Sequence, residues 1–369
     1  MSQRLFYGFL LLYLLALLHL VTTLPIGPHE ALVYYEDHGI LGYLAHLCDG
    51  CFGNSLDFRL PFLLFGVMNI PLFYYISYFY FKNSEESYLA TTIFLLLPGI
   101  ITASVIINIA VIVIGLVLSF IILYEKQHHL SAYVVMVLLL LVHDASIIFF
   151  IGVAIFALSR TEYYLFSLSL LLGVLSLLLF NGLDIGGVPK GKFLELFGLY
   201  MALFSPLVFF YFFYALYRIW IKETKGILWY ISFTAFMVSI FLSFRQQVIM
   251  TDVAPYVIVA VVLMLVTYHK TLHVRLPQFQ QGYIVGYRIV MGSLVLSAVI
   301  IFFHSTLFIF LKDRRQHFAY RFYQPYWLSL ELKKRGQNCY TVKDKRVQYQ
   351  LRYYGIKECS SLDVPKIHN

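Results

Sequence analysis

The fold is decided by an apolar stretch that reads LATTIFLLLPGIITASVIINIAVIVIGLVLSFIILY, residues 89–124. It contains no Asp, Glu, Lys or Arg, and it is longer than the roughly 20 residues that one membrane-spanning helix needs. We therefore expect two short helices here, separated near residues 104–108. Solid blocks of Leu, Ile, Val and Phe differ from the weak alternation of membrane β-strands, so the spans are predicted to be helical.

The composition of the whole chain agrees with a polytopic membrane protein. Of its 369 residues, 60% are hydrophobic and only 12% are charged, and the mean hydropathy is +0.78. Soluble proteins are about 45–50% apolar and about 25% charged, so this chain has too little charge to coat a water-facing surface of its size. A soluble enzyme, a disordered chain and a nucleic-acid-binding domain are therefore disfavoured.

The apolar runs predict eleven transmembrane helices in a domain over residues 1–311. Run 89–124 is divided as above, and run 130–158 is divided at His143-Asp144, because a buried aspartate at mid-bilayer is expensive. If the chain does not break there, every later helix would cross the membrane in the opposite direction, and the tail would be cytoplasmic. The runs are 5–24, 61–81, 89–124, 130–158, 163–180, 197–217, 227–244, 253–268 and 286–311.

The charges predict an orientation with the N-terminus in the cytoplasm. Eleven helices then place eight cations in inside loops and four in outside loops, as the positive-inside rule requires. The inside set is Lys82, Lys126, Arg160, Arg218, Lys222, Lys225, Lys270 and Arg275, and the outside set is Arg59, Lys190, Lys192 and Arg245.

Residues 312–369 are predicted to form a small, basic, extracytoplasmic α/β domain. They carry 13 of the basic and 5 of the acidic residues, which accounts for the whole net charge of +8. Helices are expected over 326–336 and 345–354, with strands over 339–342 and 356–360. A disulfide between Cys339 and Cys359 is plausible if these strands are neighbours. Cys48 and Cys51 are read as structural or unpaired.

The most polar stretch before this tail is residues 25–60, which we expect to be a first external loop with helices lying in the membrane interface. A carboxylate beside a membrane helix, backed by aromatic rings, can act as a general base on an acceptor hydroxyl or amine. The alternative is that these residues only solvate and cap interfacial helices. The candidate residues are His29, Glu30, Tyr34, Tyr35, Tyr43, His46, Asp49 and Arg59.

Other candidates lie further along the chain. Lys190 and Lys192 flank a glycine in a loop and can hold a lipid phosphate, or they can belong to an ordinary solvated loop. Arg245 can clamp a phosphate or simply extend its charge to the interface. His143-Asp144 can be a proton-relay pair or a cap at a helix end. No metal site is expected, because His128-His129 make a poor one, and no cofactor is expected.

The order PHEALVYYEDHGILGYLAHLCDG, residues 28–50, followed by FGNSLDFRLP, residues 52–61, resembles the first external loop of the GT-C glycosyltransferases. The similarity is greatest to the branch with protein O-mannosyltransferases and the lipid A aminoarabinose transferase. It implies a GT-C fold, with Glu30 or His29 as the catalytic base. It also implies substrate-binding roles for a wider set: Tyr35, Tyr43, His46, Asp49, Arg59, Lys190, Lys192, Arg245 and Tyr256.

The chain departs from this family pattern at three places. His29 stands where the family has an aspartate, Leu47-Cys48 stands for Pro-Pro, and residues 106–110 lack an expected acidic residue. A histidine can replace an aspartate as a base near neutral pH. The same departures fit a catalytically inactive relative.

The resemblance therefore implies a divergent glycosyltransferase of the bacterial cytoplasmic (inner) membrane. Its expected partners are a polyprenyl-phosphate-linked sugar, a lipid, glycan or protein acceptor, and membrane lipids, with no nucleic acid. The alternatives are an inactive membrane scaffold and a transporter of lipid or solute. A transporter would show functional charges within helices and inverted repeats, of which only Asp144 is found.

Overall fold

The computed structural model describes residues 1–180, 191–311 and 313–359, and no strand is present among these residues. From the N-terminus to the middle of the chain, the helices are α1 (Gln3–Thr23), α2 (Pro28–Glu36), α3 (Ile40–His46), α4 (Leu56–Phe81), α5 (Ser84–Leu96), α6 (Pro98–Val105), α7 (Ile109–Glu125), α8 (His129–Val142), η1 (Asp144–Ser146), α9 (Ile147–Arg160) and α10 (Tyr163–Phe180).

The second half of the chain is helical as well. They are α11 (Phe193–Phe204), α12 (Pro206–Lys222), α13 (Ile227–Ser243), α14 (Met250–Ile258), α15 (Val261–Val274), α16 (Pro277–Phe302), α17 (His304–Phe310), η2 (Arg314–Gln316), α18 (Tyr320–Lys334) and α19 (Lys345–Tyr353).

The chain divides into two compact units, each described here by itself. The core unit comprises Met1–Tyr13, Leu64–Ser104 and Asn108–Val299. The loop–tail unit comprises Leu14–Leu63, Val105–Ile107 and the chain from Ile300 onward. The loop–tail unit therefore joins the polar stretch that follows α1 to the C-terminal tail.

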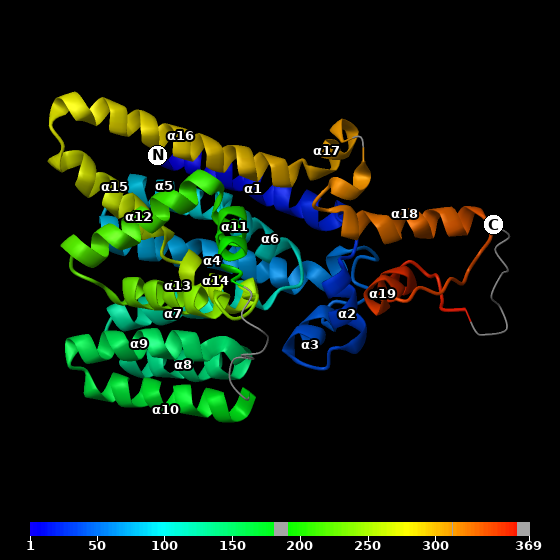
Figure 1. The fold of residues 1–369 in the computed structure, drawn as a ribbon, viewed down its shortest axis with the longest axis horizontal. Helices are drawn as coiled ribbons and strands as arrows, with labels where there is room; N and C mark the ends of the chain where they lie inside the picture. The colour runs from blue at the N-terminus through cyan, green and yellow to red at the C-terminus, as the bar shows by residue number, and fades with distance from the viewer. Residues whose placement is uncertain (181–190, 312, 360–369) are drawn as a thin grey trace. The chain divides into compact units, whose positions relative to one another are not determined.

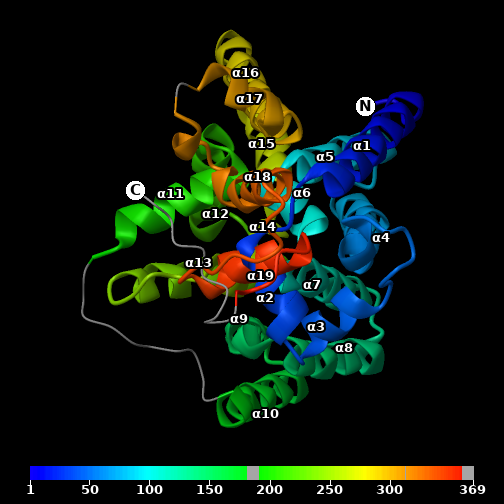
Figure 2. The same ribbon diagram turned by 90° about the vertical axis from the view of Figure 1, so that its right-hand side faces the viewer.

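In the core unit, more than half of the residues of α7 are buried, and this helix packs against α8 and α14. Helices α8, α9 and α10 lie side by side (Figures 1 and 2), and α9 also packs against α13. Gly152 permits this last contact, because a Cβ at that position would lie 3.0 Å from the Cα of Ile231. Small residues let membrane helices approach closely, since packing rather than water exclusion joins them.

The predicted breaks in the apolar runs are confirmed, and the structure adds two sharp bends. The chain leaves helix at residues 106–108 and again at His143, as expected. A further break at Leu97-Pro98 bends α5 from α6 by 65°, and one at Ser205-Pro206 bends α11 from α12 by 105°. Proline supplies no N–H to the preceding turn and disfavours helix in the residue before it, which explains both bends.

The predicted count of eleven spanning helices is not confirmed. Five described helices are long and apolar enough to cross a membrane, or seven if each bent pair counts as one span. The helices over 109–125, 129–142 and 227–243 are apolar but shorter. At 1.5 Å per residue, the longest of these covers about 25 Å of a hydrocarbon layer about 30 Å thick.

The predicted α/β character of the tail is also not confirmed. Its two helices are present as α18 and α19, but among the described residues the expected strands are reduced to one isolated parallel bridge, Cys339 with Lys357. Two backbone hydrogen bonds make this bridge, from Tyr340 N–H to Lys357 O at 2.9 Å and from Lys357 N–H to Asn338 O at 2.9 Å.

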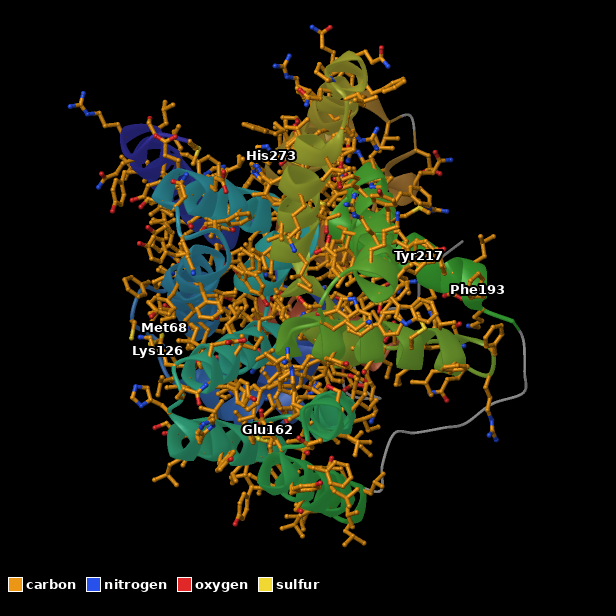
Figure 3. All side chains as sticks on the ribbon, turned by 90° about the vertical axis from the view of Figure 1, so that its left-hand side faces the viewer. Met68, Lys126, Glu162, Phe193, Tyr217 and His273 are labelled. Atoms are coloured by element: carbon orange, nitrogen blue, oxygen red, sulfur yellow. A yellow bond between two sulfur atoms is a disulfide. The ribbon has the colours of Figure 1, made fainter. Side chains whose placement is uncertain are left out.

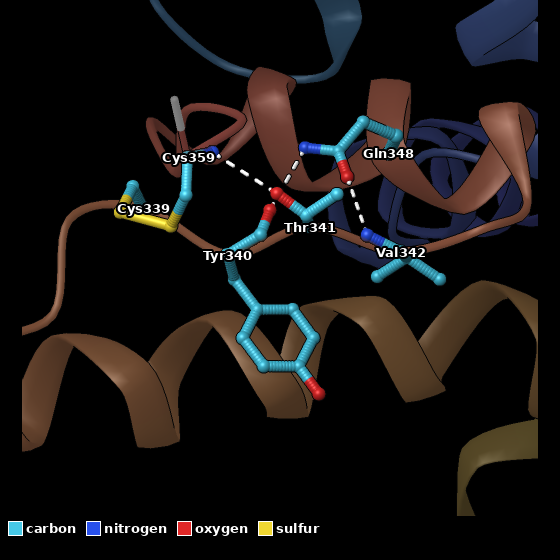
Figure 4. Close-up of a disulfide and its surroundings, with 6 residues drawn as sticks. All are labelled: Cys339, Tyr340, Thr341, Val342, Gln348 and Cys359. Atoms are coloured by element: carbon cyan, nitrogen blue, oxygen red, sulfur yellow. Dashed lines mark hydrogen bonds between the residues drawn. A yellow bond between two sulfur atoms is a disulfide. The ribbon is translucent and has the colours of Figure 1, made fainter. Parts of the chain in front are cut away.

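The predicted Cys339–Cys359 disulfide is present and lies beside this bridge (Figure 4). Gln348 of α19 fastens the same segment, because its side chain donates to Tyr340 O at 3.0 Å and accepts from Val342 N–H at 2.9 Å. Leu332, Leu351 and Ile356 form a small buried cluster beneath it. The tail thus combines a cross-link, a short bridge and a core of three side chains.

Reduction of the disulfide is expected to destabilise the tail by about 3 kcal/mol, because the bridge closes a loop of 20 residues. Cys48 and Cys51 are unpaired, so a reductant acts on this bridge. Limited proteolysis of the detergent-solubilised chain should then cleave the tail faster with reductant than without. A Cys48→Ser/Cys51→Ser variant is the control and should respond as the parent does. Equal cleavage rates in the two conditions would contradict the expected contribution.

Candidate functional site in the first loop and the tail

Glu30 is the centre of the first loop, and it is buried, with only 2% of its surface exposed. Its Oε1 accepts from Arg59 Nε at 2.8 Å and from Ile107 N–H at 3.1 Å. Its Oε2 accepts from Arg59 Nη2 at 2.5 Å and from Gly27 N–H at 2.7 Å. The last bond folds Glu30 back onto the backbone N–H of Gly27, the residue that precedes α2. Four N–H donors surround the carboxylate, and each of its two oxygens accepts two hydrogen bonds.

Arg59 is completely buried and is fully hydrogen-bonded as well. Besides Glu30, its guanidinium donates to three carbonyl oxygens where α1 ends: Val21 at 3.0 Å, Leu24 at 2.7 Å and Pro25 at 3.0 Å. All five guanidinium N–H groups thus have an acceptor. The pair fastens the start of α4 to the end of α1 and the start of α2.

Two more carboxylates of the loop accept hydrogen bonds from backbone N–H groups and so fix the course of the loop. Asp37 accepts from Gly39 N–H at 2.8 Å and from Gly42 N–H at 3.1 Å. Asp57 accepts from the N–H groups of residues 50, 52 and 53 at 3.2, 2.7 and 3.0 Å. Gly42 is required at its position, because a Cβ there would lie 1.9 Å from the Asp37 carbonyl oxygen. These contacts account physically for the glycines and acids of the loop pattern.

His46 connects the end of α3 to α2. Its Nδ1 lies 2.6 Å from Asp49 Oδ2 and its Nε2 lies 2.8 Å from Tyr34 O. Tyr34 also donates its hydroxyl to Asp49 at 3.1 Å. The hydrogen bond to Asp49 raises the pKa of His46 above its ordinary value. A protonated ring donates from both nitrogens, which matches both acceptors.

His29 differs from its neighbours because its side chain is exposed while Glu30 beside it is buried. Partial burial of the ring and the nearby Arg346 guanidinium lower the pKa of His29, and this outweighs the opposite effect of Glu30 and Asp37. The imidazole is therefore neutral at pH 7. Of the two predicted catalytic residues, His29 is the one with solvent access and an unprotonated ring.

The tail lies against this loop through α19, which packs on α2. The Tyr354 hydroxyl accepts from Ile26 N–H at 3.1 Å, and Gln350 donates to Ile26 O at 2.7 Å. Tyr349 donates to Glu36 at 2.5 Å. This contact is not predictable from local sequence, because its residues lie more than 300 positions apart.

Tyr35 and Tyr43, both predicted to bind substrate, have different surroundings. The Tyr35 ring stacks on Tyr349 with centroids 5.5 Å apart and lies 4.7 Å from the Arg352 guanidinium carbon. Tyr43 on α3 is 71% exposed. Tyr35 therefore belongs to the contact between loop and tail, whereas Tyr43 faces solvent or lipid.

The comparisons with known proteins bear on the fold. No protein-family model matches the sequence, and no curated protein sequence matches it. Among solved structures, the chain is similar to a crystal structure of ArnT from Cupriavidus metallidurans in the apo state. The similarity has a TM-score of 0.57 and 12% sequence identity, over 94% of this chain and 84% of that one. The chain has an ArnT-like fold. At the level of fold, this agrees with the GT-C resemblance of the first loop.

Within this ArnT-like fold, the remaining predicted residues lie in the core unit. Lys192 Nζ contacts Gln247 Oε1 at 3.2 Å and Glu195 Oε2 at 3.5 Å. Arg245 is exposed just beyond α13. Tyr256 is completely buried, and its hydroxyl lies 2.7 Å from His143 Nδ1. Lys190 falls outside the described residues.

The core unit also has several cavities that were not predicted from the sequence, including a basic one and an apolar one. One, of about 410 Å³, is lined by Arg218, Lys222 and Arg275 together with Tyr217 (labelled in Figure 3). The other is an apolar groove of about 470 Å³ between α9, α12 and α13, with Lys225 and Trp229 among its lining residues. A signal for the first was present in the sequence, since Arg218 and Lys222 lie one helical turn apart.

Proposed function

We propose that the chain is an integral-membrane glycosyltransferase. It moves a sugar from a polyprenyl-phosphate donor to a lipid, glycan or protein acceptor at the outer face of a bacterial cytoplasmic membrane. The observation that carries the proposal is the ArnT-like fold, which extends over 94% of the chain. The first-loop pattern that resembles GT-C enzymes is built here into an ordered unit around Glu30 and Arg59.

In this proposal His29 is the general base and Glu30 is a positioning residue. His29 has the exposed, neutral imidazole that can take a proton from an acceptor hydroxyl or amine. Glu30 and Arg59 satisfy each other and fix the N-terminus of α2, where His29 lies. Arg245 is the exposed cation for the donor phosphate, whose departure needs positive charge.

The lipid part of the donor is assigned to the apolar groove between α9, α12 and α13. Its volume of about 470 Å³ and its aromatic lining suit a segment of an isoprenoid chain. For the tail, the Cys339–Cys359 disulfide supports a location outside the cytoplasm, because disulfides persist in oxidising compartments. Any odd number of membrane crossings, including five or seven, would produce that location for a chain with a cytoplasmic N-terminus.

The test of the function is the lipid content of a bacterial strain that lacks this gene. We expect one polyprenyl-phosphate sugar to accumulate in its lipid extract, measured by mass spectrometry against the parent strain. Reintroducing the gene should reverse the accumulation. A second readout is transfer by the purified chain in detergent, supplied with that lipid.

Two outcomes would replace this function with another. An unchanged lipid profile together with no transfer by the purified chain would indicate a scaffold. Accumulation of a lipid on one side of the membrane, with no change in its chemistry, would indicate a transporter.

A further inference from the structure

Three ligand-type side chains of the core unit converge where α8 ends and α14 begins. A ring nitrogen of His143, a carboxylate oxygen of Asp144 and a carboxylate oxygen of Asp252 all lie within 4.8 Å of one another. His143 follows the last residue of α8, Asp144 opens η1, and Asp252 is in the first turn of α14, which packs against η1. The proposed transfer reaction uses none of the three.

His143 is the most informative member, because it is only 2% exposed. Its Nδ1 is hydrogen-bonded to Tyr256 Oη at 2.7 Å, and its buried Nε2 has no hydrogen-bond partner among the residues that the structure describes. A buried polar atom left unpaired costs folding free energy. If Nδ1–H donates to Tyr256, then Nε2 presents a bare lone pair. Metal-binding histidines usually have this arrangement, with the second ring nitrogen donating to a fixed partner.

Helix capping alone does not explain the group. An aspartate in the first turn of a helix is favourable, and Asp144 Oδ1 accepts from its neighbour Ala145 N–H at 3.0 Å. Asp252 Oδ1 likewise accepts from Thr251 Oγ1 at 3.1 Å. Capping leaves the two carboxylates close together, where like charges repel, and it gives Nε2 of His143 no partner. A cation bound by Nε2 and by the two carboxylates would resolve both problems.

We propose that His143, Asp144 and Asp252 bind one divalent transition-metal ion of the Zn²⁺ class. One imidazole nitrogen and two carboxylate oxygens favour such an ion over Mg²⁺ or Ca²⁺, which prefer oxygen ligands alone. Three protein ligands leave a tetrahedral position for water or another ligand. In this proposal the hydroxyl of Tyr256 orients the His143 ring.

The test uses the full chain in detergent after chelator treatment, in a Cys48→Ser/Cys51→Ser background so that thiols do not bind the probe. Titration with Zn²⁺ should show one bound ion per chain by calorimetry and by elemental analysis. His143→Gln and Asp252→Asn should abolish binding, and Tyr256→Phe should weaken it about 10- to 100-fold. His128→Gln, an exposed histidine outside the cluster, is the matched control and should bind Zn²⁺ as the background does.

Substitution of the buried His143 could prevent folding, so the test also needs a variant at an exposed ligand. Asp144 is exposed, so Asp144→Asn should fold and should weaken Zn²⁺ binding at least about tenfold. Bound Co²⁺ should give a tetrahedral visible spectrum that is lost in the same variant. The proposal is overturned if the background chain binds no Zn²⁺, or if Asp144→Asn binds it as tightly as the background.

Discussion

Replacing Glu30 with glutamine is expected to destabilise the loop–tail unit by about 3–5 kcal/mol, because it leaves a buried, charged Arg59 without its counter-ion. The glutamine amide would also point a donor at N–H groups that already donate. Thermal unfolding in detergent should show a midpoint lower by roughly 5–15 °C.

The matched control for this prediction is Glu36→Gln on the same helix. Glu36 is exposed and accepts one hydrogen bond from Tyr349, so its loss should change stability by about 1 kcal/mol or less. The double variant Glu30→Gln/Arg59→Met should be much less destabilised than the sum of the two single variants, because the residues act as one unit. A Glu30→Gln chain as stable as Glu36→Gln would contradict the structural role of the pair.

Replacing His29 with asparagine is expected to lower sugar transfer by about 10²- to 10⁴-fold, the usual contribution of a general base. The side chain is exposed, so the free energy of unfolding should change by no more than about 0.5 kcal/mol. The activity of the unsubstituted chain should be constant near pH 7. It should fall once the pH drops below the lowered pKa of His29, because protonation removes the base.

His38→Asn is the control, since His38 is another exposed histidine of the same loop. It should retain both the activity and the acid limb of the pH profile. The assignment of His29 fails if His29→Asn retains full transfer, or if its residual activity shows the same acid limb. A Glu30 variant cannot decide this question, because loss of folding and loss of chemistry would look alike.

The helices were predictable because their signal is local. Residues 163–180 were predicted as a helix and form α10 with those bounds, since a continuous apolar run between polar residues has few other structures in a bilayer. The bend at Leu97-Pro98 was missed although Pro98 was visible. Prolines also occur inside intact helices, as Pro255 does in α14, and tertiary packing decides between these outcomes.

The site was only partly predictable. The sequence order selected Glu30, His46, Asp49 and Arg59, and the structure pairs Glu30 with Arg59 and His46 with Asp49. It did not indicate that the first pair is sealed from solvent, because that depends on carbonyl groups at the end of α1. One signal was present: Gly-Pro-x-Glu, residues 27–30, is typical of a helix start whose glutamate folds back on the backbone.

The hydrogen bonds that join Ile26 to Gln350 and Tyr354 can form only late in the synthesis of the chain. Ile26 leaves the ribosome early, but Gln350, which completes its pairing, is 324 residues later in the chain. At 5–20 residues per second, translation needs about 15–65 s to span that interval. Until then the backbone N–H and C=O of Ile26 lack these two partners. Closure of the first loop therefore requires that residue 350 has been synthesised, and a shorter nascent chain lacks the finished loop–tail unit.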